Sequence, residues 1–288
     1  MTASSIDLAG NNGLDSLARL IGDVRAAAPR ADMLMVGAMA RDLLLMHAHG
    51  VRIARATVDV DLAFAIEDWT GFEWLCAQLT GSGLFKAHRA VAHRLYYRET
   101  VQIDVIPFGG VERPDRSIAW PPDGSVVMNV LGYREAMASA KNVKLPQDQS
   151  GKVVSLPALT VLKVLAWEQR HNIQPDKDAS DLMLVLRNYL DAGNAERLYL
   201  EAAHLLENDD FDYQVAGAWL LGRDAAAVIL THNKAPAEAI RRVTGIIEPE
   251  IDPDGPLRLI GQAQGVNPDQ DTRLLAAFYK GFTQERKP

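Results

Sequence analysis

Apolar residues near the start of the chain recur at the spacing of a helix. The segment 14–28 places them every three or four residues, at Leu14, Leu17, Ile21 and Val24. This spacing puts all four side chains on one face of a helix. We therefore predict an amphipathic helix here, ended by the proline that follows the segment.

A buried strand, a glycine and a helix are predicted next. Residues 33–36 form a continuous apolar run that ends at Gly37, and residues 38–47 are rich in Ala, Leu and Met. A glycine between a strand and a helix lets the backbone approach a ligand closely, and the helix start offers free N–H groups to phosphate. An ordinary turn followed by a surface arginine, Arg41, explains the same residues.

The stretch 57–64 alternates between apolar and acidic residues and predicts a β-strand. Side chains alternate between the two faces of a strand. We therefore expect Val58 and Val60 on a buried face and Asp59 and Asp61 on the other. Two carboxylates at this spacing repel each other unless a divalent metal or a basic side chain lies between them. A solvated strand face is the alternative interpretation.

A hairpin formed by residues 94–98 and 101–107 adds a third carboxylate, Asp104, opposite an apolar face. If its second strand pairs beside the 57–64 strand, then Asp104 converges with Asp59 and Asp61. Three clustered carboxylates suit magnesium, which prefers oxygen ligands. Asp104 would also be placed to accept a proton from an attacking hydroxyl.

The pattern after Ser155 is mostly helical. Helices are predicted over residues 157–171, 178–191, 195–206, 212–231, 235–246 and 268–284. The fold class is therefore α+β. We expect a mixed αβ domain over residues 1–154, built on a mixed sheet with flanking helices, and a helical domain over 155–288.

The first helices of the second half carry charged residues among apolar ones. Lys163 and Arg170 lie seven residues apart and share a helix face. A lysine among apolar neighbours needs an anion such as phosphate, unless its long stem reaches solvent. Asp178 is expected to cap the next helix, and Asp181 to lie in its first turn or to face the same side.

Composition narrows the class of protein. The net charge of −7 over 288 residues argues against a protein that coats nucleic acid. The basic run from His88 to Arg98 is a local patch that could meet RNA, although a solvated strand surface explains it better. The single cysteine, Cys76, excludes a disulfide within the chain and is expected to be a small buried hydrophobe. The start of the sequence lacks a signal-peptide pattern and no apolar run is long enough to cross a membrane, so we expect a cytoplasmic protein.

Four motifs, taken in order, resemble those of the DNA polymerase-β-like nucleotidyltransferase superfamily. They are the Gly37 turn, the Asp59-Val-Asp61 pair, the Gln102-Ile-Asp104 strand and the downstream signature from Lys163 to Leu182. The last is similar to the AbiEii-type branch, which includes toxins of toxin–antitoxin and phage-defence systems. The second residue of the glycine motif is usually Gly or Ser, and here it is Ala38. Alanine keeps the backbone N–H but lacks the serine hydroxyl.

The resemblance implies a nucleoside triphosphate as substrate and two magnesium ions, with manganese as a substitute. It assigns the metal and the catalytic role to Asp59, Asp61 and Asp104. It assigns contacts with the nucleotide and its phosphates to Gly37, Ala38, Arg41, Lys163, Asp178 and Asp181. In this account the domain over 1–154 is the nucleotidyltransferase domain, and the enzyme moves a nucleoside monophosphate to an acceptor hydroxyl and releases pyrophosphate.

The acceptor and the partners stay open. RNA or tRNA is one acceptor class, and a small molecule such as an aminoglycoside is another. A nucleotide-binding regulatory protein that has lost catalysis is a third hypothesis, against which the presence of all three acids speaks. The branch also implies an antitoxin protein as a partner, and no membrane partner is expected.

Overall fold

The computed structural model describes residues 5–53, 57–207, 209–248, 263 and 267–284. The chain divides into two compact units, which are described separately. The first unit comprises Met1–Ala48 and Arg52–Ser155, and the second comprises His49–Val51 and Leu156–Pro288. The first four residues, on which part of the expectation about a signal peptide rests, lie outside the described residues.

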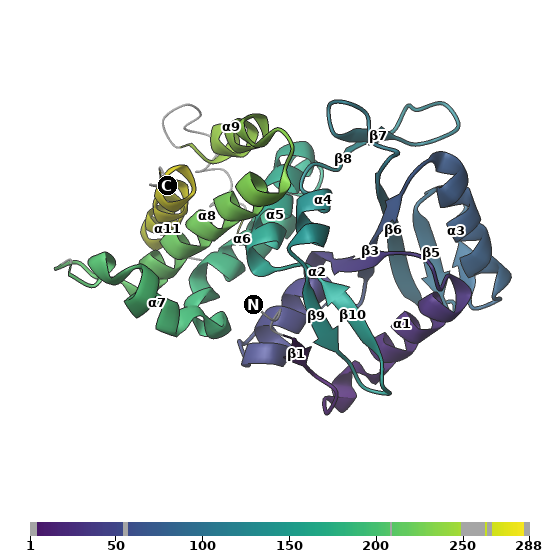
Figure 1. Cartoon of the computed structure of the whole chain (residues 1–288), viewed down its shortest axis with the longest axis horizontal. Helices are drawn as coiled ribbons and strands as arrows, with labels where there is room; N and C mark the ends of the chain where they lie inside the picture. The colour runs from purple at the N-terminus through teal and green to yellow at the C-terminus, as the bar shows by residue number, and fades with distance from the viewer. Residues whose placement is uncertain (1–4, 54–56, 208, 249–262, 264–266, 285–288) are drawn as a thin grey trace. The chain divides into compact units, whose positions relative to one another are not determined.

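The first unit is built on an eight-stranded mixed sheet, in the order β1-β9-β10-β2-β3-β6-β5-β4 (Figure 1). Its strands are β1 (Ile6–Asp7), β2 (Met33–Val36), β3 (Val60–Ile66), β4 (Phe85–Ala87), β5 (Arg94–Tyr97), β6 (Val101–Gly109), β9 (Lys141–Lys144) and β10 (Ser150–Val153). A separate antiparallel pair consists of β7 (Ser117–Ala119) and β8 (Val127–Asn129). The expected mixed sheet with flanking helices is confirmed.

The helices of this unit follow the apolar spacing. They are α1 (Asp15–Ala27), α2 (Gly37–Asp42), which continues into the π-helical turn Leu43–His47, α3 (Trp69–Gly81) and α4 (Tyr133–Ala138). The apolar stripe of α1 is buried, as the spacing predicts. Asp68 caps α3, where its carboxylate accepts a hydrogen bond from the Gly71 N–H at 2.8 Å. The half-buried Cys76 lies on this helix, and burial raises the pKa of its thiol to about 11.

The acidic strand starts later than its sequence pattern predicts. The ladder of β3 begins at Val60, so that Asp59 lies just before it. The side chain of Val58 is 79% exposed and does not share the buried face of Val60. The backbone N–H of Thr57 donates to the Asp42 carboxylate at 3.0 Å instead of to a neighbouring strand. Alternation alone cannot locate this boundary, because it continues through the residues that lead into the strand.

The second unit is helical, and the helices predicted after Ser155 are all present. They are α5 (Leu156–Arg170), α6 (Lys177–Asn188), α7 (Ala195–Glu201), α8 (Tyr213–His232), α9 (Pro236–Ile247) and α11 (Pro268–Thr283). Figure 1 shows α8 beside α11, and glycines make this approach possible. A Cβ on Gly222 would lie 2.1 Å from the carbonyl oxygen of Phe278. Within the described part of the chain, no helix is both long and apolar enough to span a membrane.

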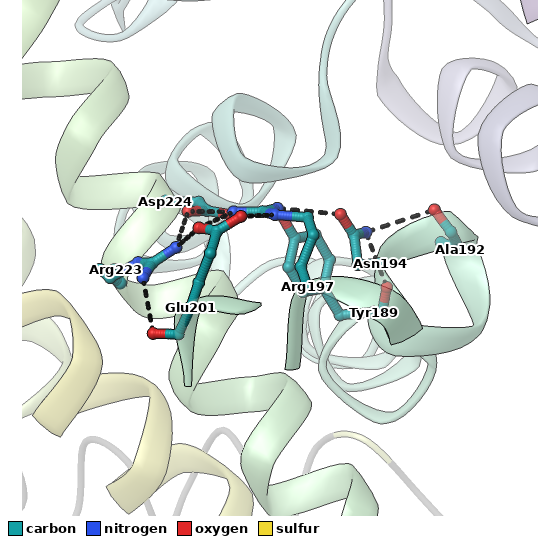
Figure 2. Close-up of polar contacts among 7 residues, drawn as sticks. All are labelled: Tyr189, Ala192, Asn194, Arg197, Glu201, Arg223 and Asp224. Atoms are coloured by element: carbon teal, nitrogen blue, oxygen red, sulfur yellow. Dashed lines mark hydrogen bonds and ion pairs between the residues drawn. The ribbon is translucent and has the colours of Figure 1, made fainter. Parts of the chain in front are cut away.

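A polar network joins α7 to α8 in this unit (Figure 2). The guanidinium of Arg197 donates to both oxygens of Asp224, at 2.7 and 3.0 Å, and to Glu201 in its own helix. Tyr189 donates to Asp224 at 2.6 Å, and Arg223 pairs with Glu201 and Asp224. The network fixes the short helix α7, in which Leu198 is the buried side chain, to the long helix α8.

Candidate nucleotidyl-transfer site

Four residues lie in one row across four neighbouring strands of the first unit. Val36 of β2 pairs with Asp61 of β3, Asp61 pairs in parallel with Asp104 of β6, and Asp104 pairs with Arg94 of β5. Residues in register on adjacent strands project from the same face of a sheet. The predicted pairing of the Asp104 strand beside the acidic strand is therefore confirmed, and it brings two of the predicted acids together.

Gly37 packs directly against the first of these acids. Its φ of +69° lies in the left-handed region, which favours glycine. A Cβ at this position would lie 1.8 Å from Oδ2 of Asp61, where no side chain fits. The turn between β2 and α2 therefore needs a glycine for two reasons, backbone conformation and space. Ala38 follows, half-buried, as the second residue of α2.

Arg94 is the cation of this site. Its Nε donates to Oδ1 of Asp104 at 2.8 Å and its Nη2 donates to Oδ2 at 2.9 Å, so the pair is bidentate. The hydrogen bond to Asp104 raises the pKa of Arg94, and the charge of Asp59 contributes in the same direction. The charge of Asp59 therefore acts on Arg94 although Asp59 precedes the strand.

The interpretation of the basic run as a solvated strand surface is wrong for Arg94, which pairs with Asp104. The register of the hairpin indicates this pair. The turn of the hairpin pairs Tyr97 with Val101. The antiparallel register then pairs Arg94, three residues before Tyr97, with Asp104, three residues after Val101. Arg98, in the same basic run, is half-exposed and pairs with Asp23, while Arg89 is exposed.

Arg41 is buried, so the alternative interpretation of this turn, with a surface arginine, is wrong. It is 6% exposed, and its guanidinium donates to Oδ1 of Asp42 through Nε at 2.8 Å and Nη2 at 2.5 Å. The other oxygen of Asp42 accepts the backbone N–H of Thr57. Asp42, which no sequence motif indicates, thus connects helix α2 to the residues that lead into Asp59.

The chemistry of these carboxylates suits magnesium, but their present arrangement is not a finished metal cage. Asp59, Asp61 and Asp104 offer oxygen ligands of the kind that magnesium prefers. Within the part of the chain that the structure describes, however, no group of three or more His, Cys, Asp or Glu side chains is arranged to hold a metal ion. A cation, the guanidinium of Arg94, already lies against Asp104.

The remaining predicted residues form a second cluster, within the second unit. Lys163 of α5 lies between two acids of α6: its Nζ is 3.1 Å from Oδ1 of Asp178 and also contacts Asp181. Arg170, two turns further along α5, donates to both oxygens of Asp178 at 2.5 and 2.8 Å. The four charges thus compensate one another across the α5–α6 pair.

Burial decides the chemistry of this second cluster. Lys163 is 5% exposed, so its ammonium does not reach solvent. Burial alone would lower the pKa of Lys163, but the charges of Asp181 and Asp178 outweigh it, and the pKa is raised. Burial opposes ionisation of Asp178, yet the hydrogen bond from Arg170 and the charge of Lys163 hold its pKa below the usual value. Asp178 is not the N-cap as expected, because Asp176 occupies that position.

Comparison with known proteins identifies the family of this chain. Residues 19–287 match the family described as "Nucleotidyl transferase AbiEii toxin, Type IV TA system". No curated protein matches the chain. The solution structure of the antibiotic-resistance factor ANT(2'')-Ia is similar at 15% sequence identity and a TM-score of 0.37, covering 67% of this chain and 98% of that chain. A TM-score this low does not establish a shared fold. The family match spans nearly the whole sequence, and the chain therefore belongs to the AbiEii nucleotidyltransferase family.

Proposed function

We propose that this nucleotidyltransferase moves a nucleoside monophosphate from a nucleoside triphosphate to an acceptor hydroxyl and releases pyrophosphate, with the reaction centred on Asp61 and Asp104. The observation that carries the proposal is their register. Two carboxylates project side by side from neighbouring strands, directly beside the Gly37 turn. A solvated strand face does not need a glycine under one of its carboxylates.

The glycine turn supplies the contact with the triphosphate in this proposal. The left-handed backbone of Gly37 and the N–H of Ala38 form the start of α2, and Gly37 adds no side chain of its own between this backbone and a ligand. The missing hydroxyl at Ala38 removes one donor but leaves the backbone donor. Arg41 is buried against Asp42, so we propose that it supports the turn through that pair before any contact with phosphate.

Asp59, Asp61 and Asp104 would hold magnesium, two ions in the proposed form, with manganese as a substitute. When bound, the metal would supply charge stabilisation for the phosphates and activation of the acceptor hydroxyl. Asp104 would also accept the proton of that hydroxyl once Arg94 no longer contacts it. The assignment of Lys163, Asp178 and Asp181 to the nucleotide remains a prediction, since each has a charged partner within the second unit.

For the acceptor we propose RNA, with the acceptor end of tRNA as the first substrate to test, and for the biological role a toxin countered by an antitoxin protein. The family description supports the toxin role. The acid-rich composition allows only a local RNA footprint. A small cationic acceptor such as an aminoglycoside is the second candidate, because the half-buried acids of the site favour a cation.

One experiment separates the acceptors. Purified protein is incubated with magnesium and each α-labelled nucleoside triphosphate, against total RNA in one arm and aminoglycosides in the other. Label in RNA supports the proposal, and label only in the drug replaces RNA by a small molecule. Asp61→Asn must abolish the labelling, while Glu73→Gln, an exposed acid of the same unit, must not. Growth arrest by the wild-type chain, absent with Asp61→Asn, tests the toxin role.

A further inference from the structure

We propose that Arg94 is a built-in competitor for the metal: it occupies Asp104 while no nucleotide is bound and thereby weakens metal binding by the free enzyme. This inference rests on the proposed function, because it takes Asp61 and Asp104 as metal ligands. It assigns Arg94 a role in metal and phosphate binding that neither the motif pattern nor the family description contains.

Arg94 and Asp104 form a bidentate pair. Both oxygens of Asp104 accept hydrogen bonds from the planar fork of Arg94, at 2.8 and 2.9 Å. Gln102, oriented with its amide oxygen toward the guanidinium, accepts from Nε at 3.2 Å and Nη2 at 3.1 Å. Arg94 is therefore held against Asp104 by several contacts at once, and a bidentate, charge-assisted pair is stronger than a single hydrogen bond.

The positive charge of Arg94 opposes metal binding at Asp104. A divalent ion bound between Asp61 and Asp104 would lie within a few ångströms of the guanidinium, and like charges at that distance repel each other. An arginine cannot lose its charge near neutral pH. The metal must therefore displace Arg94 or bind more weakly beside it.

Arg94 must be able to leave Asp104, which requires that the pair reach solvent. The side chain of Arg94 is 28% exposed and that of Asp104 is 16% exposed, so both border solvent. The backbone of β5 stays paired with β6 when the side chain moves. A triphosphate offers the same bidentate geometry to a guanidinium as a carboxylate does. We infer that Arg94 exchanges Asp104 for phosphate when the nucleotide and its metal arrive together.

The test measures metal binding directly, with Mn²⁺ as the probe and without nucleotide, from the loss of the free-ion signal in electron paramagnetic resonance. Arg94→Gln removes the charge, Arg94→Lys keeps the charge but not the fork, and Arg89→Gln is the matched control at an exposed arginine of the same segment. We expect Arg94→Gln to bind Mn²⁺ at least about tenfold more tightly than wild type, because the charge-assisted pair is lost. Arg94→Lys should fall between the two, and Arg89→Gln should equal wild type.

Equal or weaker Mn²⁺ binding by Arg94→Gln would overturn the inference. A second measurement uses the transfer reaction: loss of the phosphate contact should raise KM for the nucleoside triphosphate more than it lowers kcat. The double variant Asp61→Asn with Arg94→Gln separates the inference from the proposed function. If it binds Mn²⁺ as tightly as Arg94→Gln does, the metal lies elsewhere and the metal assignment of the proposed function fails. If Asp61→Asn abolishes transfer while Arg94→Gln leaves Mn²⁺ binding unchanged, only the role of Arg94 fails.

Discussion

The carboxylate of Asp61 fills the space that a side chain at Gly37 would need, with Oδ2 only 1.8 Å from the position of an added Cβ. The strand that carries the acid and the turn proposed to bind phosphate are therefore packed against each other without a gap. This contact ties the position of one proposed metal ligand to the backbone of the turn. A change at either residue should therefore affect both metal binding and phosphate binding.

Gly37→Ala should damage both folding and activity. The substitution forces a left-handed backbone on alanine, which costs roughly 1–2 kcal/mol, and it pushes the Asp61 carboxylate aside. We expect a free energy of unfolding lower by at least about 2 kcal/mol and a transfer rate at least about a hundredfold lower in the protein that still folds. Urea unfolding and single-turnover transfer measure the two effects.

Gly10→Ala is the control for this substitution, because no atom lies within 4 Å of an added Cβ there. It should leave both quantities unchanged. Wild-type transfer by a folded Gly37→Ala variant would show that the contact between Gly37 and Asp61 does not position the site.

Lys163→Met should destabilise the second unit. The change leaves Asp178 and Asp181 buried with less compensating charge, and breaking a buried ion pair in this way costs about 3–5 kcal/mol. Lys177→Met, at an exposed lysine of the same unit, should change stability by less than about 0.5 kcal/mol. Nucleotide affinity, measured where both variants are folded, tests the phosphate role of Lys163 separately: an unchanged dissociation constant would assign the residue to structure alone.

The stability contributed by Asp178 should depend on pH. Its pKa is lowered in the folded state, so its contribution is fully present above the unfolded value of about 3.9 and is lost as the pH falls through the folded value. The difference in unfolding free energy between wild type and Asp178→Asn should therefore be constant near neutral pH and shrink below about pH 4. A difference that stays constant into strong acid would contradict the ion-pair account.

The network in Figure 2 predicts an unusual titration at its surface. Hydrogen bonds from Arg197 lower the pKa of Glu201 to about 2. Burial acts in the opposite direction, and a hydrogen bond from Arg223 lowers the pKa further. Replacing Arg197 by Gln should return this pKa toward the ordinary value of about 4.3. Carboxyl chemical shifts followed by NMR during acid titration report both values. A wild-type Glu201 that titrates near the ordinary value would show that Arg197 does not hold this carboxylate in solution.

Much of the fold could be predicted because its elements have strong local patterns. The helices of the second unit follow long apolar periodicities, and β2 is bounded by Gly37 at its end. The strands β1, β4, β7 and β9 were not predicted. The first three have only two or three residues, too few to show an alternation, and β9 contains a single apolar residue, Val143. Such strands are specified by their partners in the sheet, which the local sequence does not reveal.

The site could be predicted in part for the same reason. Asp61 and Asp104 are visible as acids that alternate with buried residues on two strands. The partners of the charged groups are not visible in this way. The register of the hairpin pairs Arg94 with Asp104. The packing of α5 against α6 pairs Lys163 with Asp178 and Asp181. Whether a buried charge is paired with a ligand or with the protein itself depends on such tertiary contacts.

Pyrophosphate release tests the central claim most directly, because it reports nucleotidyl transfer whatever the acceptor is. The measurement compares wild type, Asp61→Asn and Glu73→Gln with magnesium, a nucleoside triphosphate and total RNA, after matched unfolding curves have shown that all three are folded. We predict release by wild type and Glu73→Gln and only background release by Asp61→Asn or after removal of magnesium by a chelator. Release at the wild-type rate by a folded Asp61→Asn protein would contradict the account.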